Sequence, residues 1–260
     1  GFNSIIRRIN QILSINENNK IVIVLSAMKN TTNFLLKNNL KDALELNLKL
    51  VDDLELNKNV INKISLLTNN YKNKRELVSL GEILSTNIFY EYITKNNIID
   101  AELLDSKKFM KALNEYDDDD ELYLSSEYYA DYNIFSKLTS NKKVYICQGF
   151  IASTLNKNDI CLIGRGGSDT SASLIANMLN SNSIEIWTDV NGMYTADPNK
   201  IKNSRIINDI GYNEAQELAA MGAKVLHPYC IIPCKNKNIP MTIRNTYDFS
   251  SMINTKICNK

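Results

Sequence analysis

The sequence predicts an α/β protein, a three-layer αβα sandwich with a mainly parallel central sheet. Apolar runs of strand length alternate with segments of helical periodicity along most of the chain, and this alternation is typical of parallel sheets covered by helices. Hydrophobic residues make up 44% of the 260 residues, which is enough for a buried core, and the length suits one large domain or two closely joined lobes. Such folds bind ligands at the carboxyl ends of their strands, so the loops of interest are 26–32, 164–169 and 188–197.

The predicted strands are short runs rich in Ile, Val and Leu. Lys20–Ala27 is a continuous β-branched run, which predicts burial on both faces. Lys142–Ala152 and Asp159–Gly164 flank a polar turn, so they predict a hairpin. The remaining strands are expected at the start of Ile98–Ser106, in Ser183–Val190 and in Ile239–Asn245.

Helices are predicted where apolar residues recur at intervals of three and four. The segments are Ser4–Leu13, Leu40–Leu67 (one or two helices), Arg75–Ile93, Ser171–Leu179 and Asn213–Gly222. Gly81 lies inside the third of these, where glycine costs about 1 kcal/mol relative to alanine, so we expect a close approach by another segment there. The run Asp117–Asp120 is expected to be a solvated loop.

The composition excludes several classes of protein. A net charge of +1 gives none of the basic excess that nucleic-acid binding uses, and no apolar run is long enough to span a membrane. The five cysteines are scattered without a Cys-x-x-Cys pair, which indicates reduced thiols in a cytoplasmic protein. A single histidine, His227, argues against a zinc site, and we expect no metal held by the protein alone. The first residues do not form a signal peptide and include no initiator Met, so we expect the natural start to lie upstream.

A glycine-rich loop, Gly164–Asp169, joins a predicted strand to a predicted helix. Its glycines let backbone N–H groups approach an anion, the helix adds the positive end of its dipole, and Arg165 adds a planar cation. A plain strand-to-helix turn with Ser168 or Asp169 as N-cap explains the same residues. The loop alone does not decide between these interpretations, although it lacks the Gly-Lys-Ser/Thr ending of a Walker A loop.

Two further segments carry polar groups that suit a nucleotide. Trp187–Pro198 follows a strand and contains Thr188, Asp189 and Tyr194, which could surround a base and ribose or form an ordinary polar loop. Gly222–Pro228 contains Lys224, which could reach a phosphate or lie in solvent. In the same segment we expect His227 to be packed or partly exposed rather than a catalytic base.

The predicted helix Arg75–Ile93 carries Ser79, Glu82 and Ser85 at intervals of three, so these side chains share a face. On a mostly apolar helix a buried glutamate needs a cationic partner, and the ammonium group of a ligand would supply one. Considered alone, the helix would equally allow an exposed Glu82 on a polar face.

These segments, in this order, resemble the catalytic domain of aspartate kinases in the amino acid kinase family. The matching runs are "SLGEILS", "QGFIAS", "GRGGSD", "WTDV" and "GAKVLHP", together with "VLSAMKNTTN" near the start. The likeness extends from about Ile21 to Thr246, and the lysine-sensitive type is the nearer one. The resemblance therefore implies the amino acid kinase fold, with an N-terminal aspartate-binding part of about residues 1–150 and a C-terminal nucleotide-binding part of about residues 151–260.

The resemblance also implies a role for each matching residue. Arg165 would hold the α-carboxylate of aspartate and Glu82 its ammonium group, and the rest of that pocket would be Thr32, Gly166, Gly167 and Ser168. Thr188, Asp189, Tyr194 and Lys224 would bind ATP. Asp169 would be the catalytic aspartate that organises the lysines around the transferred phosphoryl group, with Lys224 as a catalytic cation.

The implied chemistry needs no general base. The side-chain carboxylate of aspartate has a pKa of ~3.9, so it is already an ionised nucleophile at neutral pH. Phosphoryl transfer then needs in-line placement and cations, for which ATP, Mg²⁺ and Lys224 are the expected sources. The expected product is 4-phospho-L-aspartate, on the route to lysine, threonine and methionine.

Three departures from the family's pattern bear on these expectations. The family's initial Lys-Phe-Gly-Gly-Thr-Ser motif is absent, which we attribute to truncation of the sequence rather than natural loss. Asn199 stands where the family has an arginine that helps to bind ATP. The regulatory domains that commonly follow are also absent, so a fragment of a longer protein, bifunctional in some members, is expected.

Two other functions stay open at this point. A member of the same family could use another acceptor, such as glutamate, or the chain could bind an amino acid without catalysis. The residues do not decide whether the protein forms a homo-oligomer.

Overall fold

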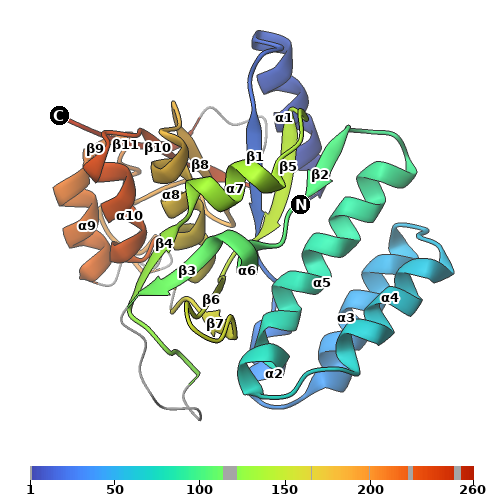
Figure 1. Ribbon diagram of the computed structural model, residues 1–260. Coiled ribbons are helices and arrows are strands. Elements are labelled where there is room, and N and C mark those ends of the chain that lie inside the picture. The colour runs from blue at the N-terminus through green and yellow to red at the C-terminus, as the bar shows by residue number, and fades with distance from the viewer. Residues whose placement is uncertain (1, 114–121, 165, 199, 222–224, 249–252) are drawn as a thin grey trace. The chain divides into compact units, whose positions relative to one another are not determined.

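The computed structural model of the chain describes residues 2–113, 122–164, 166–198, 200–221, 225–248 and 253–260. The helices in these ranges are α1 (Phe2–Ile15), α2 (Thr31–Leu36), α3 (Leu40–Asp53), α4 (Lys58–Thr68), α5 (Lys74–Lys95), α6 (Ser106–Phe109), α7 (Tyr132–Leu138), α8 (Gly167–Leu179), α9 (Tyr212–Ala220) and α10 (Pro228–Asn236). The strands are β1 (Ile21–Leu25), β2 (Ala101–Leu103), β3 (Met110–Leu113), β4 (Glu127–Ala130), β5 (Val144–Gln148), β6 (Ile151–Ser153), β7 (Ile160–Leu162), β8 (Ile184–Thr188), β9 (Asp209–Gly211), β10 (Met241–Asn245) and β11 (Thr255–Cys258). The α/β class is confirmed (Figure 1).

The described strands form three sheets in which parallel pairing predominates. Their strand orders are β1-β5-β2, β8-β10-β11-β9 and β4-β3-β6-β7. The chain divides into two compact units, one of Ile9–Gly164 and one of Gly1–Arg8 with Arg165–Lys260.

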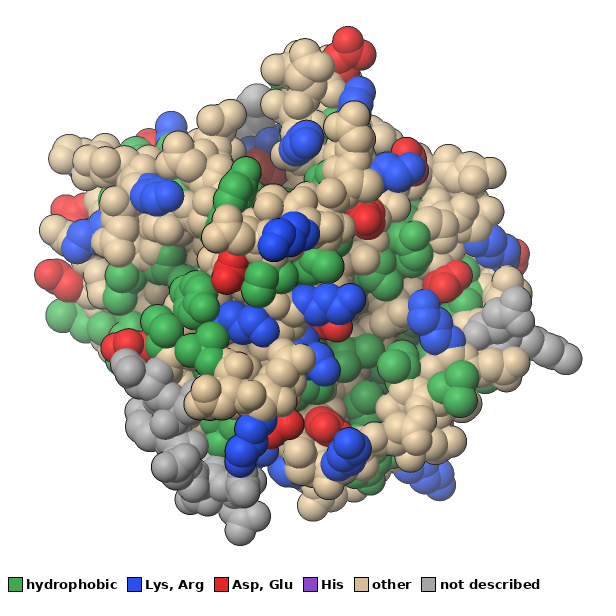
Figure 2. Space-filling view, in the orientation of Figure 1, with side chains coloured by type: hydrophobic (Ala, Val, Ile, Leu, Met, Phe, Trp, Pro, Cys, Tyr) green, Lys and Arg blue, Asp and Glu red, His purple; other side chains and the backbone are tan. Residues whose placement is uncertain are grey.

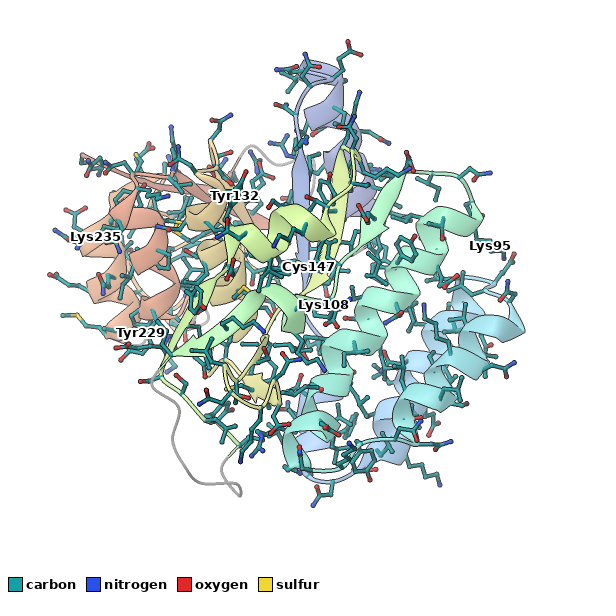
Figure 3. All side chains as sticks on the ribbon, viewed as in Figure 1. Lys95, Lys108, Tyr132, Cys147, Tyr229 and Lys235 are labelled. Carbon is teal, nitrogen blue, oxygen red and sulfur yellow. The ribbon has the colours of Figure 1, made fainter. Side chains whose placement is uncertain are left out.

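The Ile9–Gly164 unit contains the all-parallel sheet β1-β5-β2 and the small sheet β4-β3-β6-β7. The long helix α5 packs against all three strands of the parallel sheet and against α2, α3 and α4. Helix α7 packs near β5, where the ring of Phe135 meets that of Tyr145 edge-on at 6.3 Å between centroids. Cys147 on β5 lies inside the unit, whereas Lys95 at the end of α5 points outward (Figure 3).

Two strand predictions in this unit need correction. Lys142–Ala152 is not one strand, because Phe150 adopts a left-handed conformation (φ 64°) between β5 and β6, which belong to different sheets. The predicted hairpin exists, but it is formed by β6 and β7 alone. β1 is only half-buried at four of its five residues, since it lies at the edge of its sheet and not at the centre.

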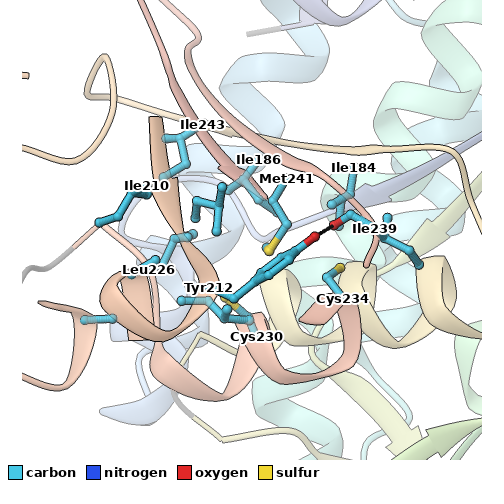
Figure 4. Packing of buried hydrophobic residues seen from close by; sticks show 14 of the residues in the cluster. Ile184, Ile186, Ile210, Tyr212, Leu226, Cys230, Cys234, Ile239, Met241 and Ile243 are labelled. Carbon is cyan, nitrogen blue, oxygen red and sulfur yellow. Dashed lines mark hydrogen bonds between the residues drawn. The ribbon is translucent and has the colours of Figure 1, made fainter. Parts of the chain in front are cut away.

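The second unit packs α8, α9 and α10 against the sheet β8-β10-β11-β9. Figure 4 shows its core, in which the ring of Tyr212 lies among Cys230, Cys234 and Met241. The Tyr212 hydroxyl donates to the carbonyl of Ile239 at 2.7 Å, so its polar tip is satisfied inside the core. This core includes residues of β8 and β10, and the predicted nucleotide segment departs from the carboxyl end of β8.

The first turns of α1 also belong to this second unit. Arg8 donates to Glu185 on β8 at 2.5 Å and 2.9 Å, and Arg244 on β10 donates to the same carboxylate at 3.2 Å. On the face shown in Figure 2, positive and negative side chains are interspersed with apolar ones. Within the described ranges, no helix combines the length and the apolar character that crossing a membrane requires.

Candidate functional site

Helix α5 places Glu82 in the interior of the Ile9–Gly164 unit. Asn73 caps the start of the helix, where its side chain accepts from the Glu76 N–H, and the middle of the helix is almost wholly buried. Gly81 is required there, since a Cβ atom at that position would lie 2.8 Å from the Cβ of Ala27. The close approach expected from a glycine inside this helix is therefore confirmed, and the approaching segment is the loop that follows β1.

The carboxylate of Glu82 is only partly satisfied. The side chain is 4% exposed, and its Oε2 atom has no hydrogen-bond partner among the described residues. Burial raises the pKa of Glu82 to about 8, although a hydrogen bond from the Ala27 backbone N–H opposes the rise. A cationic group placed beside Oε2 would favour the ionised carboxylate and remove the cost of the missing hydrogen bond. The expectation of a buried Glu82 is confirmed.

The loop after β1 and the short helix α2 are fastened to neighbouring helices. Ser85 on α5 donates to the Ser26 carbonyl at 2.7 Å, and Asn47 on α3 donates to the Thr31 hydroxyl at 3.4 Å. Lys74 at the start of α5 donates to the carbonyls of Leu35 and Leu36, at 2.9 Å and 2.6 Å, where α2 ends. These bonds hold α2, and with it the half-buried Thr32, in a fixed relation to α5.

The glycine-rich loop enters α8 without a side-chain cap. Gly166 is the N-cap residue, with φ 66° and no capping hydrogen bond from a side chain, so the suggestion that Ser168 or Asp169 caps this helix is wrong. Gly167 and the half-buried Ser168 form the first turn. A Cβ atom on Gly166 would lie 2.4 Å from the Cβ of His227, so only glycine fits. The first backbone N–H groups of α8 lack partners within the helix, as at any helix start.

Asp169 lies in the first turn of α8. Burial raises the pKa of this carboxyl group to about 6. Its negative charge also helps to raise the pKa of Cys230 on α10, which places the two side chains near each other. A desolvated carboxyl group at the start of a helix can either titrate near neutral pH or pair with cations brought by a ligand.

Thr188 and Asp189 lie at the carboxyl end of β8, beside the end of β10. The Thr246 N–H donates to the Thr188 carbonyl at 2.8 Å, and the Thr188 hydroxyl donates to the Asp189 carboxylate at 3.3 Å. Tyr194 follows on a hairpin-like segment, where it forms an antiparallel bridge with Ile206. Two of the predicted nucleotide-binding residues, Thr188 and Asp189, thus lie at the carboxyl end of β8, and Tyr194 lies on the segment that follows.

Several expected site residues lie outside the described residues. Arg165, Asn199 and Lys224 are among them, as are Gly222, Ala223 and Asp117–Asp120. His227 is described and is half-buried, and its Nδ1 accepts from the Tyr229 N–H at the start of α10. The expectation that His227 is packed or partly exposed is confirmed. Among the described residues, no three His, Cys, Asp or Glu side chains are grouped as metal ligands.

Comparison with known proteins identifies the family. The profile of the amino acid kinase family matches residues 2–245.

The chain belongs to the amino acid kinase family.

Within this family, the chain is similar to aspartokinases. It is 36% identical over 185 residues to lysine-sensitive aspartokinase 3 of Escherichia coli, which covers 71% of this chain and 40% of that protein. It is 37% identical over 204 residues to a bifunctional aspartokinase/homoserine dehydrogenase of Buchnera aphidicola, covering 78% of this chain and 24% of that protein. The chain therefore spans less than half of the length of these two relatives.

A solved structure supports the same placement. The crystal structure of Escherichia coli aspartokinase III in complex with aspartate and ADP matches with a TM-score of 0.75 at 28% identity, covering 98% of this chain and 61% of that one. The predicted amino acid kinase fold is thereby confirmed.

Sequence reasoning missed the groups that bond Glu82 and those that fasten the loop after β1 and helix α2. The Ala27 N–H and the Ser26 carbonyl belong to loop 26–32, which was of interest because ligands bind at the carboxyl ends of strands. The sequence did not predict that these two groups would bond Glu82 and Ser85. Asn47, fully buried on α3, gave no signal because one asparagine on an amphipathic helix is usually exposed.

Proposed function

We propose that this amino acid kinase is the catalytic domain of an aspartate kinase. It transfers the terminal phosphoryl group of ATP to the side-chain carboxylate of L-aspartate, forming 4-phospho-L-aspartate and ADP, the first step toward lysine, threonine and methionine. The similarity to aspartokinases supports the reaction class. The observation that carries the substrate assignment is the buried Glu82 carboxylate, whose Oε2 lacks a partner among the described residues.

The aspartate pocket that we propose has one group for each end of the amino acid, Glu82 for the ammonium group and Arg165 for the α-carboxylate. Glu82 receives the substrate's ammonium group, because an isolated carboxylate at 4% exposure is best stabilised by a cation with hydrogen-bond donors. Arg165 holds the α-carboxylate, and Thr32, Gly166, Gly167 and Ser168 complete the pocket. With both ends of the amino acid held, its side-chain carboxylate is the group left to react.

The nucleotide-binding groups are Thr188, Asp189, Tyr194 and Lys224. Tyr194 supplies an aromatic face for the base or ribose, and Lys224 supplies a compact positive charge for the phosphates. Asp169 organises the cations around the transferred group. In this proposal about residues 1–150 bind aspartate together with the loop from Arg165 to Ser168, and the rest of about residues 151–260 binds the nucleotide.

Mg²⁺ fits this site as an ion that arrives with ATP. The described residues contain no three-ligand protein cage, and Mg²⁺ commonly takes one or two carboxylates together with phosphate oxygens and waters. Asp169 and Asp189 are the described carboxylates that could contribute. The ion would offset negative charge on the phosphate oxygens.

The reaction balances without a proton acceptor. A carboxylate oxygen of aspartate attacks the γ-phosphorus, a new carboxyl O–P bond forms, and the P–O bond to the β-phosphate breaks. The bonding electrons leave with ADP. Since the nucleophile is ionised well below neutral pH, the protein must place and neutralise charge rather than remove a proton.

A hydroxamate assay tests this proposal. The full-length protein is incubated with ATP, Mg²⁺ and aspartate, and the acyl phosphate is trapped with hydroxylamine. We expect aspartyl hydroxamate with aspartate and none with glutamate. Product with glutamate would indicate another acceptor, and ATP-independent aspartate binding without any hydroxamate would indicate a non-catalytic binding protein.

We also propose, from the sequence, that the protein is cytoplasmic and that it binds neither nucleic acid nor membranes. A homo-oligomer is compatible with the sequence. No specific observation favours either alternative function over aspartate kinase.

A further inference from the structure

We infer that Thr255 is a positioning residue for nucleotide binding, because its buried hydroxyl fixes the hairpin that carries Tyr194. This inference rests on the proposed nucleotide role of Tyr194. Thr255 is the first residue of β11 and is fully buried, far in sequence from the hairpin it contacts.

We use the name Tyr194 hairpin for two adjacent chain segments, Met193–Ala196 and Ser204–Ile207. The Thr195 N–H donates to the Arg205 carbonyl at 2.9 Å, and the Ser204 hydroxyl donates to the Ala196 carbonyl at 2.7 Å. Tyr194 forms its bridge with Ile206 one residue closer to the base of the hairpin. The outer half of the hairpin is largely exposed, so its placement depends on how its base is attached.

Thr255 supplies that attachment through both hydrogen-bonding capacities of its hydroxyl. Oγ1 accepts from the Met193 N–H at 2.8 Å and donates to the Ile207 carbonyl at 2.7 Å. Met193 and Ile207 also bond to each other, with 2.9 Å from the Ile207 N–H to the Met193 carbonyl. The three groups close a ring of hydrogen bonds at the base of the hairpin.

The hydroxyl lies where the backbone ladder between β11 and β9 ends. The last ladder-like bond runs from the Lys256 N–H to the Asn208 carbonyl at 2.7 Å. One residue closer to the hairpin, the side chain of Thr255 bonds the Ile207 carbonyl. Without it, the N–H of the fully buried Met193 would lose its partner in a site closed to water.

Gly192, the residue before Met193, lets the base of the hairpin approach Thr255 closely because it has no side chain. A Cβ atom at Gly192 would lie 2.3 Å from Thr255 Oγ1 and 2.9 Å from the Thr255 backbone nitrogen. Because one of these neighbours is backbone, the clash could not be relieved by a side-chain rotation. The sequence around Tyr194 is therefore built to bring the hairpin base against Thr255.

The test variant is Thr255→Val, which removes the hydroxyl. Thr255→Ser keeps the hydroxyl, and Thr242→Val makes the same change at a half-buried position on the neighbouring strand β10 as a control. We expect Thr255→Val to raise the KM for ATP about tenfold, as the loss of a buried hydrogen bond can produce, with kcat and the KM for aspartate within about twofold of wild type. Thr255→Ser should restore the KM for ATP, and Thr242→Val should leave it unchanged. An unchanged KM for ATP in Thr255→Val, or equal rises in both KM values, would overturn the inference.

Two measurements do not depend on phosphoryl transfer. Hydrogen exchange of the peptide covering 190–198 should speed up in Thr255→Val while the α8 peptide stays protected, and unchanged exchange would overturn the inference. ATP titration followed by the fluorescence of Trp187, the single tryptophan, should show the same tenfold weakening. If wild type binds ATP but forms no aspartyl phosphate, the kinase proposal fails and the role of Thr255 stands.

If Thr255→Val does not fold, Gly192→Ala and Thr255→Ser decide the matter. Gly192→Ala should weaken ATP binding, because the added Cβ atom clashes with Thr255 Oγ1 and with the Thr255 backbone nitrogen. Thr255→Ser keeps the hydroxyl and should bind ATP as wild type does. Normal ATP binding by Gly192→Ala, or weakened ATP binding by Thr255→Ser, would overturn the inference.

Discussion

Glu82 and Tyr194 are held in place by different means. Glu82 lies on a 22-residue helix that packs on a parallel sheet, and the surroundings of its carboxylate are dry and incompletely bonded. Tyr194 is half-buried on a hairpin whose base is joined by one threonine hydroxyl and whose outer part faces solvent. The first arrangement leaves a buried carboxyl group that a cationic ligand would ionise, whereas the second makes the position of Tyr194 depend on the hydrogen bonds at the base of its hairpin.

The difference predicts which property of each site a mutation will change. In the proposed aspartate pocket, binding at Glu82 would depend on electrostatics in a water-poor environment, so charge and pH should matter most. In the proposed nucleotide site, Tyr194 would contribute a correctly placed aromatic surface, so the local hydrogen bonds should matter more than pH. The following predictions test this contrast.

The largest effect is expected for Glu82→Gln. Removing the charge of one partner in a buried ionic contact costs about 2–5 kcal/mol, so aspartate binding should weaken by roughly 10³-fold, with ATP binding unchanged. Calorimetric titration with each ligand measures both effects. Glu91→Gln is the matched control, because Glu91 lies on the same helix in a partly exposed pair with Lys63. Normal aspartate binding by Glu82→Gln would remove Glu82 from the pocket.

The second effect is a pH dependence of aspartate binding. The pKa of Glu82 is raised to about 8 without ligand, so binding an ammonium group at lower pH must first remove a proton from the carboxyl group. The dissociation constant for aspartate should therefore rise about 50-fold between pH 8 and pH 6, with close to one proton released per aspartate at pH 7. Calorimetry in buffers of different ionisation enthalpy measures the proton release. A flat profile would show that the substrate's ammonium group binds elsewhere.

The raised pKa of Glu82 should make the ligand-free protein less stable as the pH rises, whereas a salt-bridged carboxylate makes a protein more stable as the pH rises. The folded chain keeps a proton on Glu82 that the unfolded chain loses near the ordinary glutamate pKa of 4.5, so ligand-free stability should fall as pH rises from about 4.5 to about 8. Denaturant unfolding of wild type and Glu82→Gln at a series of pH values measures this fall. The variant should lack the Glu82 part of it, and parallel curves for the two proteins would contradict the assignment.

A smaller effect is expected for Tyr194→Ala. Loss of one aromatic contact with a base or ribose should raise the KM for ATP about tenfold, with little change in the KM for aspartate between pH 6 and pH 8. Steady-state kinetics at both pH values tests it. If Tyr194→Ala instead altered the pH dependence of aspartate use, the contrast between the two sites would fail.

The smallest effect is expected for Lys74→Met. This change removes the ammonium group that bonds the last carbonyls of α2, and burial already lowers the pKa of Lys74. Since the pocket loses only the fastening of α2, the KM for aspartate should rise about threefold, in keeping with the modest net value of partly exposed hydrogen bonds. Lys74→Arg should recover most of the loss. An effect as large as that of Glu82→Gln would mean that α2 contributes far more than position.

The elements that sequence predicted best are those with strong local patterns. The helix around Glu82 was expected because apolar residues repeat along it, and Gly81 was expected to meet another segment because glycine is costly there. The break at Phe150 was not expected, since an apolar run gives no sign of a single left-handed residue that sends the chain to another sheet. Helix α10 was missed because it contains Pro228 at its start and Pro233 inside it, and proline normally argues against a helix.

The sequence by itself determined the class of fold, the family resemblance and the residue types at the two sites, because these depend on periodicity and on short motifs. Only the tertiary structure decided that Ala27 bonds Glu82, that one oxygen of that carboxylate has no partner among the described residues, and that Thr255 joins the base of the Tyr194 hairpin. The physical reason is that hydrogen bonding and desolvation depend on atoms brought together from distant parts of the chain. No local pattern of residues records which of them will meet.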